Sequence, residues 1–261
     1  MLNNTTVKPT GQNKMEAKMS YSYKNEPAIQ ELDSLFNDTF MSVMRNVYLW
    51  MCLGLFVTGF VSMALIYTPL FYLLVGLLKI PFAFLGIMLI EIGVVWWLSA
   101  RIRTLSVGAS RAAFIFYAIL NGITMSIVFL VYTQSSIALT FISTASLFGA
   151  MSIIGYTTKL DLSKWGSYLL MGLVGFLIGS VVNLFFASSA LEWFLTYAGI
   201  ALFIGLTVYD TQRIRIMVTS AVQSGDETGA KLIGLLGALK LYLDFINLFL
   251  LILRLVGGRR R

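Results

Sequence analysis

The sequence predicts an all-α polytopic membrane protein with seven transmembrane helices, of which the last is central. Of its 261 residues, 58% are hydrophobic and 12% are charged, whereas soluble domains are nearer half apolar and a quarter charged. The mean hydropathy is +0.83. Seven apolar stretches are long enough to cross a hydrocarbon core of about 30 Å, which takes about 20 helical residues.

The first 41 residues are polar and mixed in charge, and they lack the apolar core of a cleaved signal peptide. We expect 1–41 to be a flexible N-terminal tail with a short helix near residues 29–40. A seven-helix transmembrane domain, 42–257, and a basic C-terminal tail, 258–261, should follow. The expected spans are residues 44–67, 80–100, 111–133, 137–157, 166–187, 192–213 and 232–256.

Loop charges predict the orientation. The second, fourth and sixth expected loops carry eight basic residues, whereas the other three carry only Lys79. Cytoplasmic loops are enriched in Lys and Arg, so the N-terminus should be cytoplasmic. Seven spans would place the C-terminus outside, where its own arginines break this rule. The last segment therefore either spans the membrane despite them, or is re-entrant and leaves the C-terminal tail inside. The eight basic residues are Arg101, Arg103, Arg111, Lys159, Lys164, Arg213, Arg215 and Lys231.

The last apolar stretch, 239–256, reads LKLYLDFINLFLLILRLV and carries four polar side chains. At 100° per residue, Lys240, Asp244, Asn247 and Arg254 share an arc of about 80° on one helix face. Charged groups are costly in hydrocarbon and normally face a protein interior or a wet cavity. We therefore expect a helix wrapped by other helices, with this face towards a site. The alternative is structural, with Lys240 and Asp244 paired at i, i+4 and Arg254 snorkelling.

Other spans also carry charge. Glu91, midway along the second, is either a hydrogen-bonded structural acid or an ion-path ligand. Asp210, at the end of the sixth, could pair with Arg213 at i+3. It could instead meet Asp244, because both lie near the same ends of adjacent antiparallel spans, which pack 8–10 Å apart. Two carboxylates in one low-dielectric site cannot both ionise cheaply, so such a pair holds a proton or binds a hard cation such as Ca²⁺. Arg45 opens the first span as an expected interfacial anchor.

Several classes of function are disfavoured. The chain has no histidine, which excludes a histidine-bearing catalytic triad and argues against haem or zinc sites. Cys52 is the only cysteine, so no intramolecular disulfide can form. Intramembrane aspartyl proteases carry a Gly-x-Gly-Asp motif and a Pro-Ala-Leu turn, but Asp244 follows Leu-Tyr-Leu and the turn is missing. We expect neither an enzyme, nor a cofactor, nor nucleic-acid binding.

Two segments together carry a specific resemblance. They are VYDTQRI at 208–214 and LYLDFINLFLLILRLVG at 241–257. Weaker support comes from IEIGVVWWLSARIRTLSVG at 90–108 and LNGITMS at 120–126. Over residues 40–257 the chain resembles the Bax inhibitor family, and most closely its bacterial branch.

The resemblance implies seven helices, the last surrounded by the other six, and a pH-sensitive calcium leak. It implies that Asp210 and Asp244 form the proton-sensing pair. It also implies that an arginine ending the second helix, either Arg101 or Arg103, latches Asp210 in the closed form, and it matches Glu91 to a family glutamate. One departure is the sixth loop, 215–231, which is longer than compact members would have.

The sequence thus favours a pH-sensitive leak channel for cations, with Ca²⁺ and protons as its ligands, in a bacterial inner membrane. The alternative is a non-conducting regulator that binds a membrane-anchored protease or a cell-death complex. The buried charged stripe favours conduction, whereas the polar N-terminal tail favours interaction with a partner.

Overall fold

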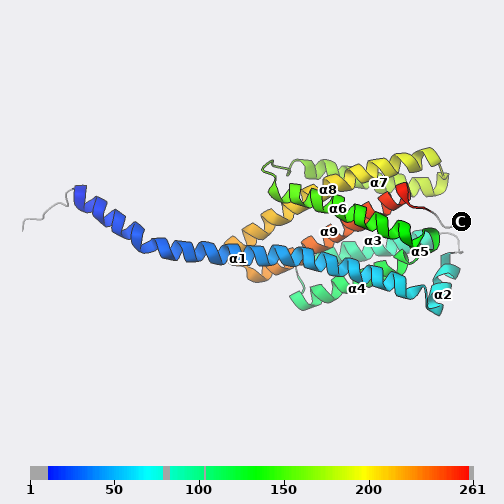
Figure 1. Ribbon diagram of the computed structural model, residues 1–261, viewed down its shortest axis with the longest axis horizontal. Helices are drawn as coiled ribbons and strands as arrows, with labels where there is room; N and C mark the ends of the chain where they lie inside the picture. The colour runs from blue at the N-terminus through cyan, green and yellow to red at the C-terminus, as the bar shows by residue number, and fades with distance from the viewer. Residues whose placement is uncertain (1–10, 79–82, 103, 259–261) are drawn as a thin grey trace, which may run out of the picture. The chain divides into compact units, whose positions relative to one another are not determined.

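The computed structural model describes the backbone of residues 11–78, 83–102 and 104–258, and the side chains from residue 34 onwards except 78–82, 84, 88, 103 and 259–261. Within this part the chain is helical and contains no strand (Figure 1). The helices are α1 (Gly11–Leu65), α2 (Pro69–Leu78), α3 (Ala83–Arg101), α4 (Val107–Met125), α5 (Val128–Val131), α6 (Gln134–Thr157), α7 (Trp165–Phe186), α8 (Ser189–Gln223) and α9 (Glu227–Val256).

The chain divides into two compact units, Met1–Ser42 and Val43–Arg261, and the boundary falls within α1. Residues 11–41, which the sequence predicts to be a flexible tail with one short helix, belong instead to α1. The first ten residues of that predicted tail lie outside the described residues, as do 259–261 of the predicted basic tail.

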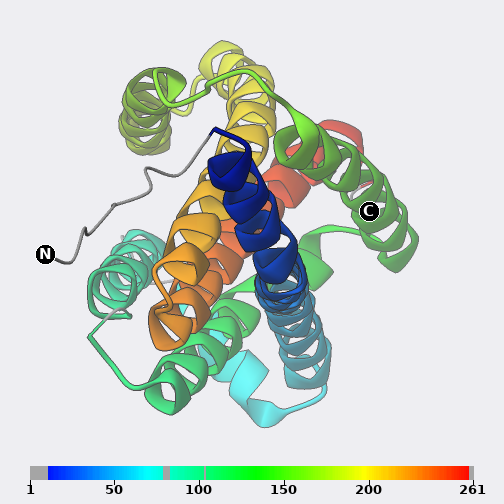
Figure 2. The same ribbon diagram turned by 90° about the vertical axis from the view of Figure 1, so that its left-hand side faces the viewer.

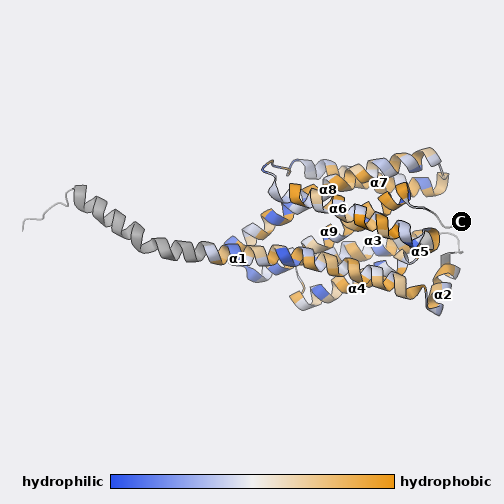
Figure 3. Ribbon diagram, viewed as in Figure 1, coloured by the Kyte–Doolittle hydropathy of each residue, from blue (hydrophilic) through white to orange (hydrophobic). Residues whose placement is uncertain are grey.

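The fold class is confirmed: this is an all-α polytopic membrane protein. Six helical segments of the described chain are long and apolar enough to cross a bilayer, and they overlap six of the seven expected spans. They are Ser34–Leu65, Val107–Val131, Gln134–Thr157, Trp165–Phe186, Ser189–Gln223 and Glu227–Val256. Figure 3 shows hydrophobic residues along the whole length of these helices within the second unit.

The seventh crossing stays a prediction, assigned to α3. Side-chain contacts show that α1 and α4 run parallel: the Arg111 guanidinium lies over the Trp50 ring, and the Ser62 hydroxyl donates to the Gly122 carbonyl. The chain must therefore return between Leu65 and Val107. Helix α3 lies in that interval and has 19 residues, or about 28 Å at 1.5 Å per residue.

The last helix is central, as predicted. Of the most apolar window of α9, 67% is buried, against 0% for α7. Helix α9 packs against α8, α6 and α4, and Figure 2 shows its orange-to-red ribbon running between them. It also meets α1, where the Tyr242 and Thr58 hydroxyls lie 2.7 Å apart. Since Thr58 donates its own proton to the Ala118 carbonyl, Tyr242 is the donor to Thr58.

Helix α9 crosses the whole bundle. Its first turns lie beside α1 near Val43, since a Cβ on Gly234 would be 3.2 Å from that side chain. At its other end, the Thr133 amide donates to the Gly258 carbonyl, and the Gly258 amide donates to the Ser136 hydroxyl. Gly258 therefore lies beside the α5–α6 connection, and α9 runs from one end of the bundle to the other, as a spanning helix would.

Helices α8 and α9 form a hairpin with a very short connection. The sequence predicts a long loop over 215–231, but α8 continues to Gln223 and α9 begins at Glu227. Gly225 adopts a φ of 73°, a value that suits glycine. The Asp226 carboxylate then caps α9 by accepting a 2.7 Å hydrogen bond from the Gly229 amide. The predicted long loop is therefore wrong, and its polar residues lie on two helix ends.

Helix α8 is also bound to the end of α6 and to the loop that follows. The Gln212 amide group donates to the Leu160 carbonyl at 2.6 Å and accepts from the Leu162 amide at 3.0 Å. Within this loop the Ser163 amide donates to Asp161, and this hydrogen bond lowers the pKa of the Asp161 carboxyl. Gln212, two residues beyond Asp210, thus ties α8 to the loop that follows α6.

Candidate functional site: a buried carboxylate pair between α8 and α9

A partly buried ion pair joins α8 to α9. The Lys240 ammonium donates to Asp210 Oδ1 at 3.2 Å. Asp210 is only 7% exposed, whereas the Lys240 side chain keeps 39% of its surface exposed. The lysine thus pairs across the helix interface rather than with Asp244 on its own helix, the i, i+4 pair that the sequence also allows. Arg213, the other partner considered for Asp210, is exposed but close enough to act on its charge.

Asp244 completes the site. It is 5% exposed, and its Oδ2 atom has no hydrogen-bond partner within the described part of the chain. Its carboxyl interacts electrostatically with both Asp210 and Lys240. The structure therefore brings together two carboxylates and one ammonium group. If both carboxylates were ionised, this site would carry a net charge of −1, which one proton or one monovalent cation would neutralise.

Two buried hydroxyl groups on α6 and α8 were not anticipated from the sequence. Thr211 on α8 and Ser152 on α6 are 0% and 5% exposed, and their oxygens also lack hydrogen-bond partners within the described residues. Both lie near the hydroxyl group of Tyr48 on α1, although neither makes a hydrogen bond of normal geometry with it. Buried polar atoms of this kind are the groups that internal water satisfies. Single Ser and Thr residues in apolar helices are common, so the sequence held no signal that would select these two.

The other two residues on the polar face of α9, the polar stripe predicted from the sequence, make local or surface contacts. The Asn247 amide donates to the Leu243 carbonyl of its own helix at 2.8 Å. Arg254 Nε lies 4.0 Å from Glu192 Oε1, and both side chains are nearly half exposed. Sequence reasoning missed Glu192, although an acid in the first turn of α8 faces the last turn of an antiparallel α9. The two ion pairs show that the stripe on α9 faces α8.

Glu91 belongs to a different part of the bundle. It lies on α3 and accepts a 2.7 Å hydrogen bond from the Thr124 hydroxyl on α4. Among the described residues it makes no ion pair, and no hydrogen bond joins it to Asp210 or Asp244. Of the two readings of Glu91, this geometry favours the hydrogen-bonded structural acid.

The arginine latch is not formed in this structure. Arg101 is exposed at the end of α3, and among the described residues the ion pair of Asp210 is made with Lys240. Arg103 lies outside the described residues. The latch therefore stays a prediction for another conformation. Arg45 is exposed on α1, as a surface anchor would be.

The buried pair should contribute more to stability than the exposed one. In a double-mutant cycle of Asp210→Asn and Lys240→Gln, we expect a coupling free energy of unfolding of about 1 kcal/mol, reduced by the partial exposure of Lys240. The matched cycle of Glu192→Gln and Arg254→Gln, on the same two helices, should give less than about 0.5 kcal/mol. Unfolding followed by circular dichroism in detergent measures both, and equal couplings would contradict the expectation.

Comparison with known proteins places this arrangement among relatives. A family model described as "Inhibitor of apoptosis-promoting Bax1" matches residues 40–261. The chain is 43% identical over 226 residues to the inner membrane protein YbhL of Escherichia coli K12, covering 83% of this chain and 92% of that protein. An uncharacterised protein of Borreliella burgdorferi is 45% identical over 178 residues, covering 68% and 76%. The protein RP147 of Rickettsia prowazekii is 38% identical over 226 residues, covering 86% and 93%.

Proposed function

Because this chain belongs to the Bax inhibitor family, we propose that it is a pH-sensitive cation leak channel, for Ca²⁺, in a bacterial inner membrane. The observation that carries the proposal is the buried group of Asp210, Lys240 and Asp244 between α8 and α9. Ionisable residues inside a membrane are costly and mark ion or proton paths. A protein that only binds a partner has no need of them there.

The chemistry of the group suits a cation that passes rather than one that stays. Calcium takes six to eight oxygen ligands, and two aspartates supply at most four. Within the described chain there is no cluster of three or more side chains of the kinds that hold metals. A Ca²⁺ ion at this site would therefore keep part of its water shell.

Protons and cations would compete for the same carboxylate oxygens, which makes the leak pH-dependent without any histidine. Lys240 neutralises one carboxylate in this conformation. We infer that opening separates Lys240 from Asp210, and that Arg101 or Arg103 latches Asp210 in another closed arrangement. A ligand or proton shifts such an equilibrium only by binding one state more tightly than the other.

The full chain, purified and reconstituted in liposomes loaded with a Ca²⁺ dye, tests the proposal. Calcium entry should exceed that of protein-free liposomes and should change between about pH 5 and pH 8, the range over which a shared aspartate proton can be released. Folded protein that gives no flux at any of these pH values would favour the second candidate, a non-conducting regulator of a membrane-anchored protease or cell-death complex. The separate unit Met1–Ser42 is the feature that favours this candidate.

The proposed orientation has its own test. Eight basic residues on one side predict that the α8–α9 turn is cytoplasmic. A reporter fused after Gly225 should therefore be cytoplasmic, whereas fusions after Tyr132 and Gly258, which lie at one end of the bundle, should both be on the far side. Each fusion is made with two reporters, one active only in the cytoplasm and one active only outside it, and the reporter that is active shows on which side the fusion point lies. A far-side signal at Gly225 would reverse the orientation.

A further inference from the structure

A shallow pocket lies where the start of the second unit in α1 meets the first turns of α4 and α9. Its empty space is about 280 Å³ when the open solvent at its mouth is included. Its polar lining is one amide, one indole and two cations, namely Asn46 and Trp50 from α1, Arg111 from α4 and Lys231 from α9. Among the residues that the structure describes, no carboxylate lines it. Three helices thus contribute donors to one place on the bundle end that is predicted to be cytoplasmic.

Arg111 is held in position by aromatic packing. Its guanidinium carbon lies 5.4 Å from the centre of the Trp50 ring. Trp50 packs edge-on against Phe114 at 6.2 Å, and Phe114 is completely buried. Within the described residues Arg111 has no ion pair with a carboxylate. Its hydrogen-bond donors are therefore positioned and available, the condition under which arginine recognises phosphate.

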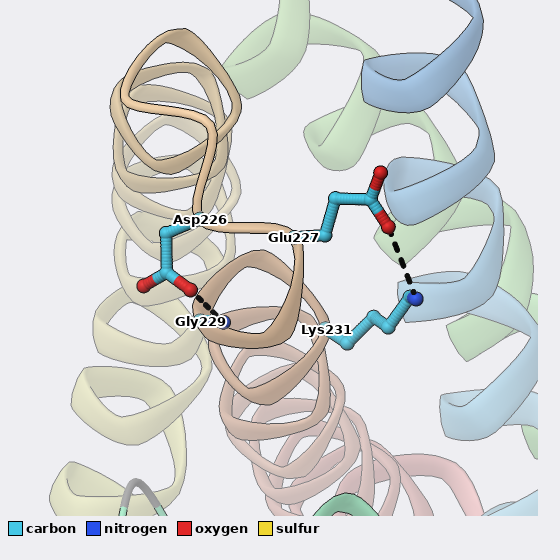
Figure 4. A network of polar contacts seen from close by, with 4 residues as sticks. All are labelled: Asp226, Glu227, Gly229 and Lys231. Atoms are coloured by element: carbon cyan, nitrogen blue, oxygen red, sulfur yellow. Dashed lines mark hydrogen bonds and ion pairs between the residues drawn. The ribbon is translucent and has the colours of Figure 1, made fainter.

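Lys231 has only a weak competing partner. Its ammonium lies 3.5 Å from Glu227 Oε2, and the two side chains are 53% and 72% exposed. Figure 4 shows this pair on one side of the first turn of α9, opposite the Asp226 cap. Exposed i, i+4 pairs of this kind are weak, so an anion in the pocket can draw the lysine away from Glu227.

An apolar strip leads from the pocket along α1. Leu49, Leu53 and Phe60 continue the helix face of Asn46, and they are 57%, 41% and 65% exposed. A free phosphate would gain nothing from this strip, whereas an acyl chain would lie along it. Tryptophan and basic residues also gather at the headgroup level of cytoplasmic membrane faces, which carry anionic lipids.

We propose that this pocket binds the phosphate group of an acidic phospholipid headgroup, with Arg111 and Lys231 as the charged donors and Asn46 as a further donor. The headgroup fastens α1, α4 and α9 to one another at this end of the bundle. The proposal does not depend on ion conduction, since none of these residues belongs to the Asp210–Lys240–Asp244 group.

The test uses the full chain in detergent, with fluorescently labelled phosphatidylglycerol as the probe and anisotropy as the readout. The double variant Arg111→Gln/Lys231→Gln should bind about tenfold more weakly, because it loses two charge-assisted contacts. The matched double variant Lys159→Gln/Lys164→Gln removes the same charge from exposed positions outside the pocket, and its affinity should change less than about twofold. Circular dichroism melts verify that both variants fold.

Competition separates the two sources of phosphate. Unlabelled phosphatidylglycerol should displace the probe, whereas inorganic phosphate at equal concentration should not. The proposal is overturned if the pocket variant binds like the unmodified protein, or if both double variants weaken equally, which would mean general charge attraction. Displacement by inorganic phosphate as effective as that by the lipid would also overturn it and assign the pocket to a soluble anion.

Discussion

Asp244→Asn protein should show Ca²⁺ flux lowered by roughly tenfold, which corresponds to about 1.4 kcal/mol lost at one charged ligand, and its flux should no longer vary with pH. The asparagine side chain keeps the shape of the buried aspartate but can neither ionise nor release a proton. Asp210 then has Lys240 as its ion-pair partner and no carboxylate with which to share a proton. Dye-loaded liposomes assayed between pH 5 and pH 8 measure both effects.

Two further variants sharpen this experiment. Asp210→Asn should also flatten the pH response, but with a different resting leak, because it removes the Lys240 contact as well. Glu192→Gln makes the same carboxyl-to-amide change on α8, at the half-exposed pair with Arg254, and should leave flux and pH profile unchanged. A folded Asp244→Asn protein whose profile overlays that of the unmodified chain would remove the aspartate pair from the mechanism.

Gly155→Ala is expected to destabilise the bundle by about 1–3 kcal/mol, the usual cost of forcing extra volume into a packed interface. A Cβ at Gly155 would collide with the backbone carbonyl oxygen of Val208 and lie 3.0 Å from the Thr211 Cβ. Neither can move without shifting α8 and with it Asp210. Thermal unfolding in detergent should show a midpoint lowered by about 2–4 °C per kcal/mol for a chain of this size.

Gly149→Ala is the matched control on the same helix. A Cβ there meets nothing within 4 Å, and alanine favours a helix interior over glycine by about 0.5–1 kcal/mol. Its unfolding midpoint should therefore stay equal or rise. If both variants unfold at the same temperature, the α6–α8 contact is not as tight as the structure has it.

Periodicity was a sufficient guide to α9. The polar stripe predicted a buried helix with one face towards a site, and the stripe does face α8. What periodicity could not supply was the partner of Lys240. The spacing of Lys240 and Asp244 is visible along one helix, whereas pairing with Asp210 depends on how two helices are aligned across their interface. For the same reason, the sequence did not show that Glu192 lies opposite Arg254.

The predicted loop over 215–231 failed for a different physical reason. A helix that leaves the membrane becomes polar on its surface, so the arginines and the sequence GDETG have the composition of a loop. The local signals were nevertheless present: a glycine suited to positive φ, followed by aspartate as a helix cap. Capping residues would have placed the start of α9 at Glu227, whereas hydropathy alone placed it at residue 232.

The central position of α9 has a consequence for how the protein is made. Chains emerge from the ribosome N-terminus first, at about 5–20 residues per second, so the helix that fills the middle of this bundle is the last to arrive. Until then, the hydroxyl group of Thr58 lacks Tyr242, Asp210 lacks Lys240, and the faces of α4, α6 and α8 that contact α9 are uncovered. Before α9 is inserted, the earlier helices must therefore lie in the membrane as a loosely packed assembly whose inner surface carries unpaired polar groups. Loss of the C-terminal segment would leave a hollow bundle rather than a shortened one.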